Sequence, residues 1–434
     1  MTNTNVINAN PTKDFFIGML TKDIPLIRAI VDLVDNSVDG AIRLRPDNDY
    51  SGLHVNLTVS ETQFVIEDNC GGIPIIIAQN YAFRFGRPVE ATTTPNSVGL
   101  FGVGMKRAIF KMGNFFEVES KTEEDYFRVS QDILDWRLES GWEFQFQEVQ
   151  NDDQNLHESG TRITVLQLHA PISEQFKLEN FRTALRNQLE AAQQISLERG
   201  LTITVNDEPL RITMLHLYQT DKIHPGFSHF QLEAYPDVSV SIYTGIYERD
   251  LVKGGWYLFC NSRLVLFADQ TSDTGWDDSA GLPKYHPDFA YSRGYVFFAS
   301  SDASLLPWNT TKTGVDTDSP IFKAVKQEMI ELMRPITKWL RGSLAEEKKE
   351  LGEEGELHAN LENAPTVSIS QLKIQPQAFS APMFVKSTNS PLASIQYKVS
   401  PERVEKVRRK LGVKSNSDVG RETFDYYYRW ECEE

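Results

Sequence analysis

Apolar and polar residues alternate along the first 200 positions with two different periods. Over residues 23–44 apolar side chains recur every three or four positions, which predicts an amphipathic helix. Residues 53–59 and 63–66 alternate with a period of two and predict a hairpin that runs into a Gly-rich turn. A Gly-rich stretch, 97–105, opens a second helix at 106–112. Further strands are expected at 115–120, 126–130, 143–149 and 162–166.

The rest of the chain divides by composition into three further parts. Residues 201–345 hold strand-like stretches and a long helix at 321–341, which Pro335 is expected to kink. Residues 346–394 are rich in Glu, Lys and Gly and then in Ser, Pro and Gln, which predicts a solvated linker. Periodicity returns in 395–434, where we expect a small strand–helix–helix module. The predicted divisions are therefore 13–200, 201–345, 346–394 and 395–434.

Composition narrows the class of protein. The 434 residues carry a formal net charge of −16, which excludes a globally basic nucleic-acid coat but not a local basic patch. Three cysteines without a CxxC pair argue against a zinc site or a disulfide scaffold. The polar N-terminus is not a secretory signal, and no apolar run approaches the roughly 18 residues of a membrane span. We expect a soluble, cytoplasmic, multidomain protein without a membrane contact.

Three polar motifs interrupt these patterns. The first lies on the first predicted helix, where Asp32, Asn36 and Asp39 share one face opposite the apolar stripe. The second, residues 67–74 (EDNCGGIP), places Asp68 at a strand end beside two glycines, where a purine ring could approach and donate its amine. The third, residues 99–106 (GLFGVGMK), opens a helix whose backbone N–H groups favour phosphate.

Each motif alone has an ordinary structural explanation. The acidic face could be the solvated side of an amphipathic helix, and the second motif could be an Asx-type turn. The third motif is neither a P-loop nor a dinucleotide-binding fingerprint. In this order and spacing, however, the three resemble the Bergerat ATP-binding fold of the GHKL superfamily, in its gyrase B, MutL and MORC branch. A fourth box is matched by Gly160 and Thr161 leading into a strand.

The resemblance implies roles at matching positions. Asn36 matches the residue that coordinates Mg²⁺ between the phosphates, and Asp68 the carboxylate that binds adenine. Asp32 occupies the position of the general base, and Thr161 lies near the adenine edge. The implied glycines and the lysine of the phosphate and adenine loops are Gly72, Gly99, Gly102, Gly104 and Lys106.

Two positions depart from the family pattern. Asp32 replaces a Glu of the gyrase-type and MutL-type members, and its shorter reach implies slow hydrolysis or a slightly shifted helix. Cys70 replaces the first Gly of the second box, and we interpret it as a small buried residue.

Residues 255–265 resemble the strand–Asn-x-Arg–strand of the transducer domain in the same branch. Residues 308–313 (WNTTKT) resemble the loop that carries a lysine to the γ-phosphate, which makes Lys312 a second catalytic candidate. A plain surface lysine is the alternative. The resemblance thus implies an α+β fold: a Bergerat α/β sandwich, an S5-like α/β transducer domain and a small C-terminal helical module.

The C-terminal module leaves two interpretations open. Strand–helix–helix in about 40 residues resembles ribbon-helix-helix DNA-binding modules, whose strands pair between two chains. The alternative is a helical hairpin that docks on its own or another subunit.

The implied function is Mg²⁺-dependent ATP hydrolysis coupled to closure of a homodimer. DNA or a DNA-processing protein would be the partner, in DNA-related or bacterial defence processes. The alternatives are a nucleotide-gated scaffold with slow or no hydrolysis and a chaperone-like clamp acting on proteins.

Overall fold

The structure is a computed structural model. It describes residues 12–22, 24–86, 97–98, 103–150, 158–279, 281–309, 311–347, 361, 364–372, 375–382 and 395–432. The chain forms two compact units, Met1–Phe384 and Val385–Glu434, and each is described here by itself. No helix among these described ranges is both long and apolar enough to cross a membrane.

The first unit begins with an eight-stranded sheet in the order β5-β4-β3-β6-β2-β1-β7-β8. All neighbouring strands are antiparallel except β1 and β7, which are parallel. The strands are β1 His54–Val59, β2 Phe64–Asp68, β3 Gly113–Lys121, β4 Tyr126–Asp132, β5 Phe146–Gln150, β6 Gly160–Leu168, β7 Thr202–Val205 and β8 Glu208–Pro209.

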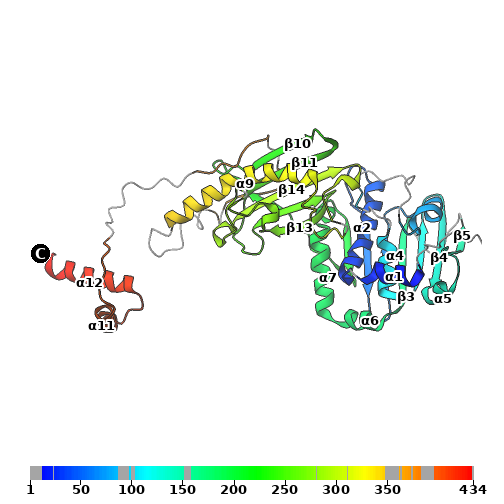
Figure 1. The fold of residues 1–434 in the computed structure, drawn as a ribbon, viewed down its shortest axis with the longest axis horizontal. Helices are drawn as coiled ribbons and strands as arrows, with labels where there is room; N and C mark the ends of the chain where they lie inside the picture. Colours follow the sequence, from blue (N-terminus) through cyan, green and yellow to red (C-terminus); the bar gives the residue numbers. More distant parts are fainter. Residues whose placement is uncertain are drawn as a thin grey trace, which may run out of the picture. The chain divides into compact units, whose positions relative to one another are not determined.

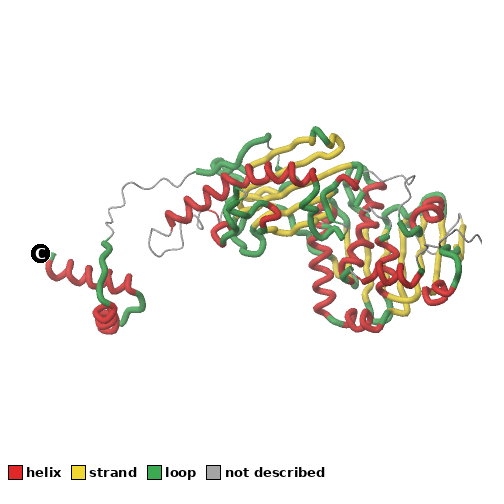
Figure 2. Tube along the Cα trace, in the orientation of Figure 1, coloured by secondary structure: helices red, strands yellow, loops and turns green. Residues whose placement is uncertain are grey.

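Helices cover this sheet, as the helix and strand colours of Figure 2 show. The helix predicted over 23–44 is α2, Leu26–Leu44, and Pro25 is its N-cap. Residues 75–83 form the short helix α3, Ile75–Ile77, which continues as a π-helix, η1, Ala78–Ala82. The others are α1 Lys13–Lys22, α4 Gly104–Met112, α5 Ile133–Leu138, α6 Ala170–Lys177, α7 Glu179–Ala192 and α8 Gln194–Glu198.

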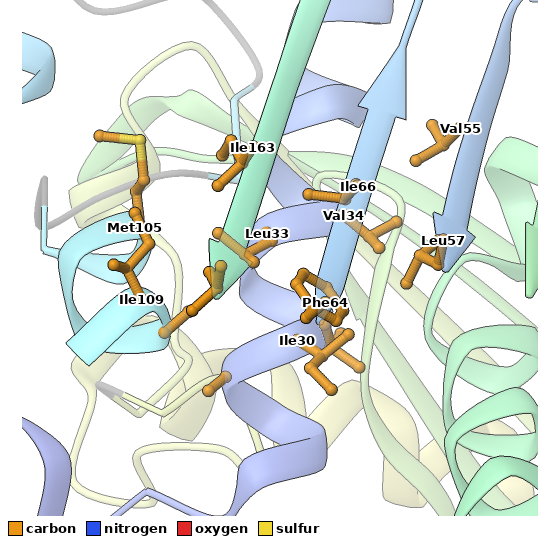
Figure 3. Close-up of a cluster of buried hydrophobic side chains, with 14 of the residues drawn as sticks. Ile30, Leu33, Val34, Val55, Leu57, Phe64, Ile66, Met105, Ile109 and Ile163 are labelled. Carbon is orange, nitrogen blue, oxygen red and sulfur yellow. The ribbon is translucent and has the colours of Figure 1, made fainter. Parts of the chain in front are cut away.

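The first core lies between the sheet and helices α2 and α4. Ile30, Leu33 and Val34 of α2 point at the strands, where Phe64 and Ile66 of β2 meet them (Figure 3). Met105 and Ile109 of α4 belong to the same core. Helix α2 packs on both the sheet and α4, so these apolar contacts fix its orientation. The predicted α/β sandwich is confirmed.

The first sheet extends past residue 200. Strand β7 pairs with β1, and Leu201, Ile203 and Val205 are buried in the first core. The sequence pattern places these residues in the second region, 201–345. A four-residue strand gives no sign of which sheet it joins, because pairing is decided by distant neighbours.

A second sheet of five strands follows, in the order β10-β11-β14-β12-β13, with β12 and β14 parallel. The long helix α9, Pro320–Glu347, continues through Pro335 and packs against β11 (Figure 1). The strands are β10 Gly226–Leu232, β11 Tyr235–Ile246, β12 Gly255–Cys260, β13 Arg263–Asp269 and β14 Ser292–Ser300. Short 3-10 helices are η2 Ser272–Thr274, η3 Pro287–Phe289 and η4 Ala303–Leu305.

Part of the predicted linker 346–394 is packed rather than solvated. Strand β15, Thr366–Ser368, pairs with β9, His216–Tyr218, in a two-stranded sheet. Ile369, Leu372 and Phe379 are buried in the cores of the second region. We name the described residues 364–372 and 375–382 the strap. Its apolar residues are too widely spaced to show periodicity, so composition alone suggested a linker.

The C-terminal unit contains two helices, α11 Pro401–Leu411 and α12 Asn416–Glu431. The Gly412 turn and the Ser415 cap with Asp418 join them. The predicted strand at 395–399 is not formed within the described residues. The described residues 395–432 contain no second strand with which this segment could pair.

Candidate functional site

The polar face of α2 is buried, which the solvated-helix alternative did not anticipate. From Ala29 to Ala41 every residue is buried except Asn36, which is exposed. Asp32, Asp35 and Asp39 therefore need partners, because a buried unpaired carboxylate is costly. Each of the three finds its partner in a different part of the unit.

Asp32 contacts helix α4. Its Oδ2 accepts a short, charged hydrogen bond from the Arg107 guanidinium. The first residue of α4, Gly104, lies against it, since a Cβ on Gly104 would stand 3.6 Å from Cβ of Asp32. The predicted general base thus lies at the start of the helix that the third motif opens, where the partial positive charge of a helix N-terminus favours a carboxylate.

Asp35 contacts the second region. The Lys312 ammonium donates to Asp35 Oδ2 at 3.0 Å, and Arg263 Nε lies 2.9 Å from Oδ1. Gln193 Nε2, at the end of α7, donates to Oδ1 at 2.7 Å. Burial alone would raise the pKa of Asp35, but the two cations hold the pKa of this carboxyl below its ordinary value. One buried carboxylate thus meets two buried cations, and positive charge is in excess.

The loop that presents Lys312 is held in shape by its own hydrogen bonds. Lys312 has a left-handed backbone, with φ at 51°, and its N–H donates to Asn309 O at 2.9 Å. The Asn309 side-chain oxygen accepts from Thr313 N and Thr311 Oγ1. Trp308 anchors the loop in the second core. Lysine rarely adopts this conformation, so holding the ammonium against α2 has a conformational cost.

Asp39 contacts residues 97–98, just before the third motif. Its Oδ1 accepts from Val98 N at 2.6 Å. The neighbouring Ser97 O accepts from Asn261 Nδ2, 3.0 Å away on the turn between β12 and β13. Val98 itself is buried in the core of the second region. These two residues therefore join α2 to the second sheet.

Asp68 lies at the end of β2 and accepts three hydrogen bonds from within the fold. Ser37 Oγ donates to Oδ2 at 2.6 Å, and the N–H groups of Cys70 and Thr161 donate to Oδ1 at 2.9 and 3.3 Å. Burial raises the pKa of this carboxyl above its usual range, against the effect of the three donors. Thr161 stands opposite Asp68 in the β2–β6 register.

In the second motif packing requires a glycine at position 72, and Cys70 is buried. Gly72 has φ at 71°, and a Cβ there would lie 2.0 Å from Lys121 O, so no other residue fits without moving the backbone. Cys70 is 2% exposed, as expected of a small buried residue, and burial raises the pKa of its thiol.

Lys106 lies inside the protein rather than on an open surface. Its ammonium donates to Ala82 O at 2.7 Å, at the end of η1, and the side chain is 3% exposed. Burial lowers its pKa to about 7. Gly99 and Gly102 fall outside the described residues.

The structure therefore brings most of the predicted residues together around α2. Asn36 and Asp32 share its polar face, Gly104 lies against Asp32, and Lys312 contacts Asp35, the residue before Asn36 in the helix. Asp68 is joined to the same helix through Ser37. Sequence analysis assigned no role to Arg107, Asp35, Arg263, Gln193 or Asn261. Asn261 and Arg263 stand inside the stretch 255–265, Asp35 lies between Asp32 and Asp39 of the first motif, and Arg107 directly follows the third motif. Gln193 carries no sequence signal.

A family model described as "Histidine kinase-, DNA gyrase B-, and HSP90-like ATPase" matches residues 24–161. This stretch includes α2, β2, α4 and the strand that carries Thr161, which is the arrangement described above. The region is a GHKL-type ATPase domain, and the match supports ATP binding. No curated protein matches the chain.

Proposed function

We propose that the protein hydrolyses Mg²⁺-bound ATP beside the exposed Asn36 of α2 and that the bound nucleotide closes a homodimer. The single observation that carries the proposal is Asn36, exposed in the middle of a buried helix and next to a cluster with excess positive charge. An exposed amide among buried carboxylates fits a ligand that brings both a cation and negative charge.

Under this proposal the nucleotide binds along the motifs in order. Asn36 would hold Mg²⁺ through its side-chain oxygen, a ligand type that this ion accepts, and the ion would neutralise phosphate charge. Asp68, Gly72 and Thr161 would surround the adenine, with the carboxylate accepting from the adenine amine. The phosphates would be bound by Gly99, Gly102, Gly104 and Lys106.

Asp32 would act as the general base. A carboxylate beside the phosphates can accept a proton from the attacking water, and its reach decides whether it does so. Arg107 occupies one of its oxygens, which leaves Oδ1 for a water. Arg107 would thereby fix the direction of the free oxygen.

Lys312 would stabilise charge on the γ-phosphate. Its ammonium is bound to Asp35, one helical position from Asn36. A phosphate oxygen would share or replace this carboxylate, and the excess positive charge around Asp35 favours that anion. The same loop would then transmit closure of the dimer to the second region.

The proposed partners follow from the family branch. A homodimer closed by ATP, acting on DNA or with a DNA-processing protein in DNA-related or bacterial defence work, fits a GHKL ATPase domain joined to a second α/β region. Turnover measured with and without DNA would test this part.

Nucleotide binding is tested first. Asn36→Ala should abolish Mg²⁺-ATP binding in calorimetry with little change in stability, because Asn36 is exposed and surface changes usually stay within about 0.5 kcal/mol. Asp68→Asn should weaken adenine nucleotides, because an amide replaces the acceptor. Asn80→Ala, on η1, is a matched exposed asparagine and should bind as wild type. Unchanged affinity in both Asn36→Ala and Asp68→Asn would overturn the proposal.

Hydrolysis is tested at Asp32. Asp32→Ala should keep ATP binding and lose roughly 10²–10⁴-fold in turnover, the usual contribution of a general base. Asp32→Glu should keep turnover or raise it, because the longer side chain restores the family's reach. If Asp32→Ala hydrolyses ATP at the wild-type rate, Asp32 is not the general base.

A second candidate function is a nucleotide-gated scaffold that hydrolyses slowly or not at all. The observation in its favour is the pair of Asp32 with Arg107, which holds a short carboxylate against α4. ATP binding without measurable turnover in the wild type, at any DNA concentration, would favour it.

A further inference from the structure

Arg263 is a buried cation to which the ATP site proposed above gives no role, although it contacts the same carboxylate as Lys312. It is the first residue of β13, is 2% exposed, and places Nε 2.9 Å from Asp35 Oδ1. One of its terminal nitrogens donates to Leu264 O at 3.1 Å. Burying a guanidinium is costly unless a negative charge accompanies it, so Arg263 depends on Asp35.

The two oxygens of the Asp35 carboxylate have different partners. Oδ1 lies against Arg263 and accepts a hydrogen bond from Gln193 Nε2, at 2.7 Å. Oδ2 accepts from the Lys312 ammonium at 3.0 Å. Arg263 and Gln193 can therefore keep Asp35 in place through Oδ1 while Oδ2 changes its partner.

The two cations on Asp35 differ in how firmly they are held. Arg263 stands opposite Cys260 in the β12–β13 register, so the sheet fixes its backbone. Lys312 lies on a loop, in a left-handed conformation. Its compact ammonium is carried on a flexible four-carbon stem, whereas a guanidinium is planar and rigid. Lys312 is consequently the cation that can leave the carboxylate.

A third cation lies close to Asp35. Arg28, half-buried in the first turn of α2, has its pKa lowered by burial and then by the nearby charge of Arg263. The Asp35 carboxylate acts in the opposite direction on this pKa. Three cations thus lie near one carboxylate, and a second anion such as a phosphate would reduce the repulsion among them.

We propose that Arg263 is a positioning residue that sets how readily Lys312 leaves Asp35 for the γ-phosphate, and thereby how strongly the site prefers ATP to ADP. Arg263 neutralises Asp35 from the Oδ1 side and so weakens the hold of the carboxylate on Lys312. Without Arg263, Asp35 would depend on Lys312 for its neutralisation and would hold it more firmly. The inference rests on the proposed ATP site and adds to it a competition between carboxylate and phosphate for one ammonium.

The two partners of one ion pair should therefore shift nucleotide preference in opposite directions. Calorimetry on the full chain with Mg²⁺ gives the Kd for ADP and for a non-hydrolysable ATP analogue, and their ratio is the preference. Asp35→Asn should raise the preference for the analogue about fivefold or more, because Lys312 is released. Arg263→Met should lower it, because Asp35 then retains Lys312. A purely structural role would move both variants in the same direction.

Two further variants complete the set. Gln193→Leu removes a neutral donor from Oδ1 and should lower the preference by less than Arg263→Met. It disturbs the buried charges least, so its direction decides the test if either charged variant fails to fold. Asp35→Asn combined with Lys312→Ala should lose the gain of Asp35→Asn, because no ammonium remains to be released.

Arg293→Met is the matched control. Arg293 is also 2% exposed and lies on β14 of the same sheet, but its guanidinium donates to Ala290 O and Glu248 O. Its loss should lower stability and leave the nucleotide preference unchanged. Shifts of Asp35→Asn and Arg263→Met in the same direction, or a gain that survives the loss of Lys312, overturn this inference and leave the ATP site standing. A wild type that binds neither nucleotide overturns the ATP site and this inference with it.

Discussion

Helices α2 and α12 have similar sequence patterns and opposite surroundings. Both carry several carboxylates, and both carry apolar residues three and four positions apart. In α2 all three aspartates are buried, and each binds a different part of the unit. In α12 one side chain is buried, and large aromatic residues face solvent.

Periodicity identifies a helix in the sequence but does not show how many of its faces are buried. The polar face of α2 is covered by α4, by residues 97–98 and by the Lys312 loop. Its carboxylates consequently hold the unit together, whereas those of α12 remain at the surface.

Removing the Asp35 carboxylate should produce the largest change in stability. Asp35→Ala leaves Arg263 and Lys312 buried without their shared partner, and breaking a buried pair costs about 3–5 kcal/mol. Glu422→Ala on the exposed face of α12 is the matched change and should stay within about 0.5 kcal/mol. Chemical denaturation of both variants measures this. Equal losses of stability in the two variants would mean that the buried carboxylate of α2 contributes no more than the exposed one of α12.

Lys312→Ala tests the contact that the second region makes with α2. If the ammonium acts on the transition state, turnover at saturating ATP should fall about 10²-fold while ATP affinity falls much less. Lys323→Ala, on α9 and paired with Asp318 at the surface, is the matched lysine and should change neither. A parallel fall of affinity with intact turnover of the bound state would make Lys312 a binding contact only.

The smallest expected effect is a pH dependence of stability that comes from Lys106. The described residues of α12 include no buried ionisable side chain. Burial lowers the pKa of Lys106 from 10.5 to about 7, so above pH 7 the unfolded chain holds a proton that the folded protein has lost. Stability should therefore rise as pH increases from 7 to 9, by roughly 1–2 kcal/mol. Lys106→Met should remove this part of the slope. The difference between the two proteins, measured by denaturation at each pH, checks it, and identical slopes would refute it.

The sequence alone determined the local elements and the nucleotide motifs of this protein. Helix α2 and the β1–β2 hairpin follow from periodicity, and helix α4 from the Gly-rich stretch before it. The order of the three motifs implied the fold that the family match supports. These features are readable because the residues that specify them are neighbours in the chain, one turn or one strand apart.

Tertiary structure alone decided which carboxylates are buried and what holds them. Lys312 is 277 positions from Asp35, and Gln193 is 158, so no local pattern links either to the helix they reach. For the same reason the sequence pattern predicted a solvated linker where the strap packs, and it placed β7 in the second region. A short segment joins whichever sheet or core the rest of the chain leaves open. Burial of a polar face is a property of everything packed around it, and one helix cannot encode that by itself.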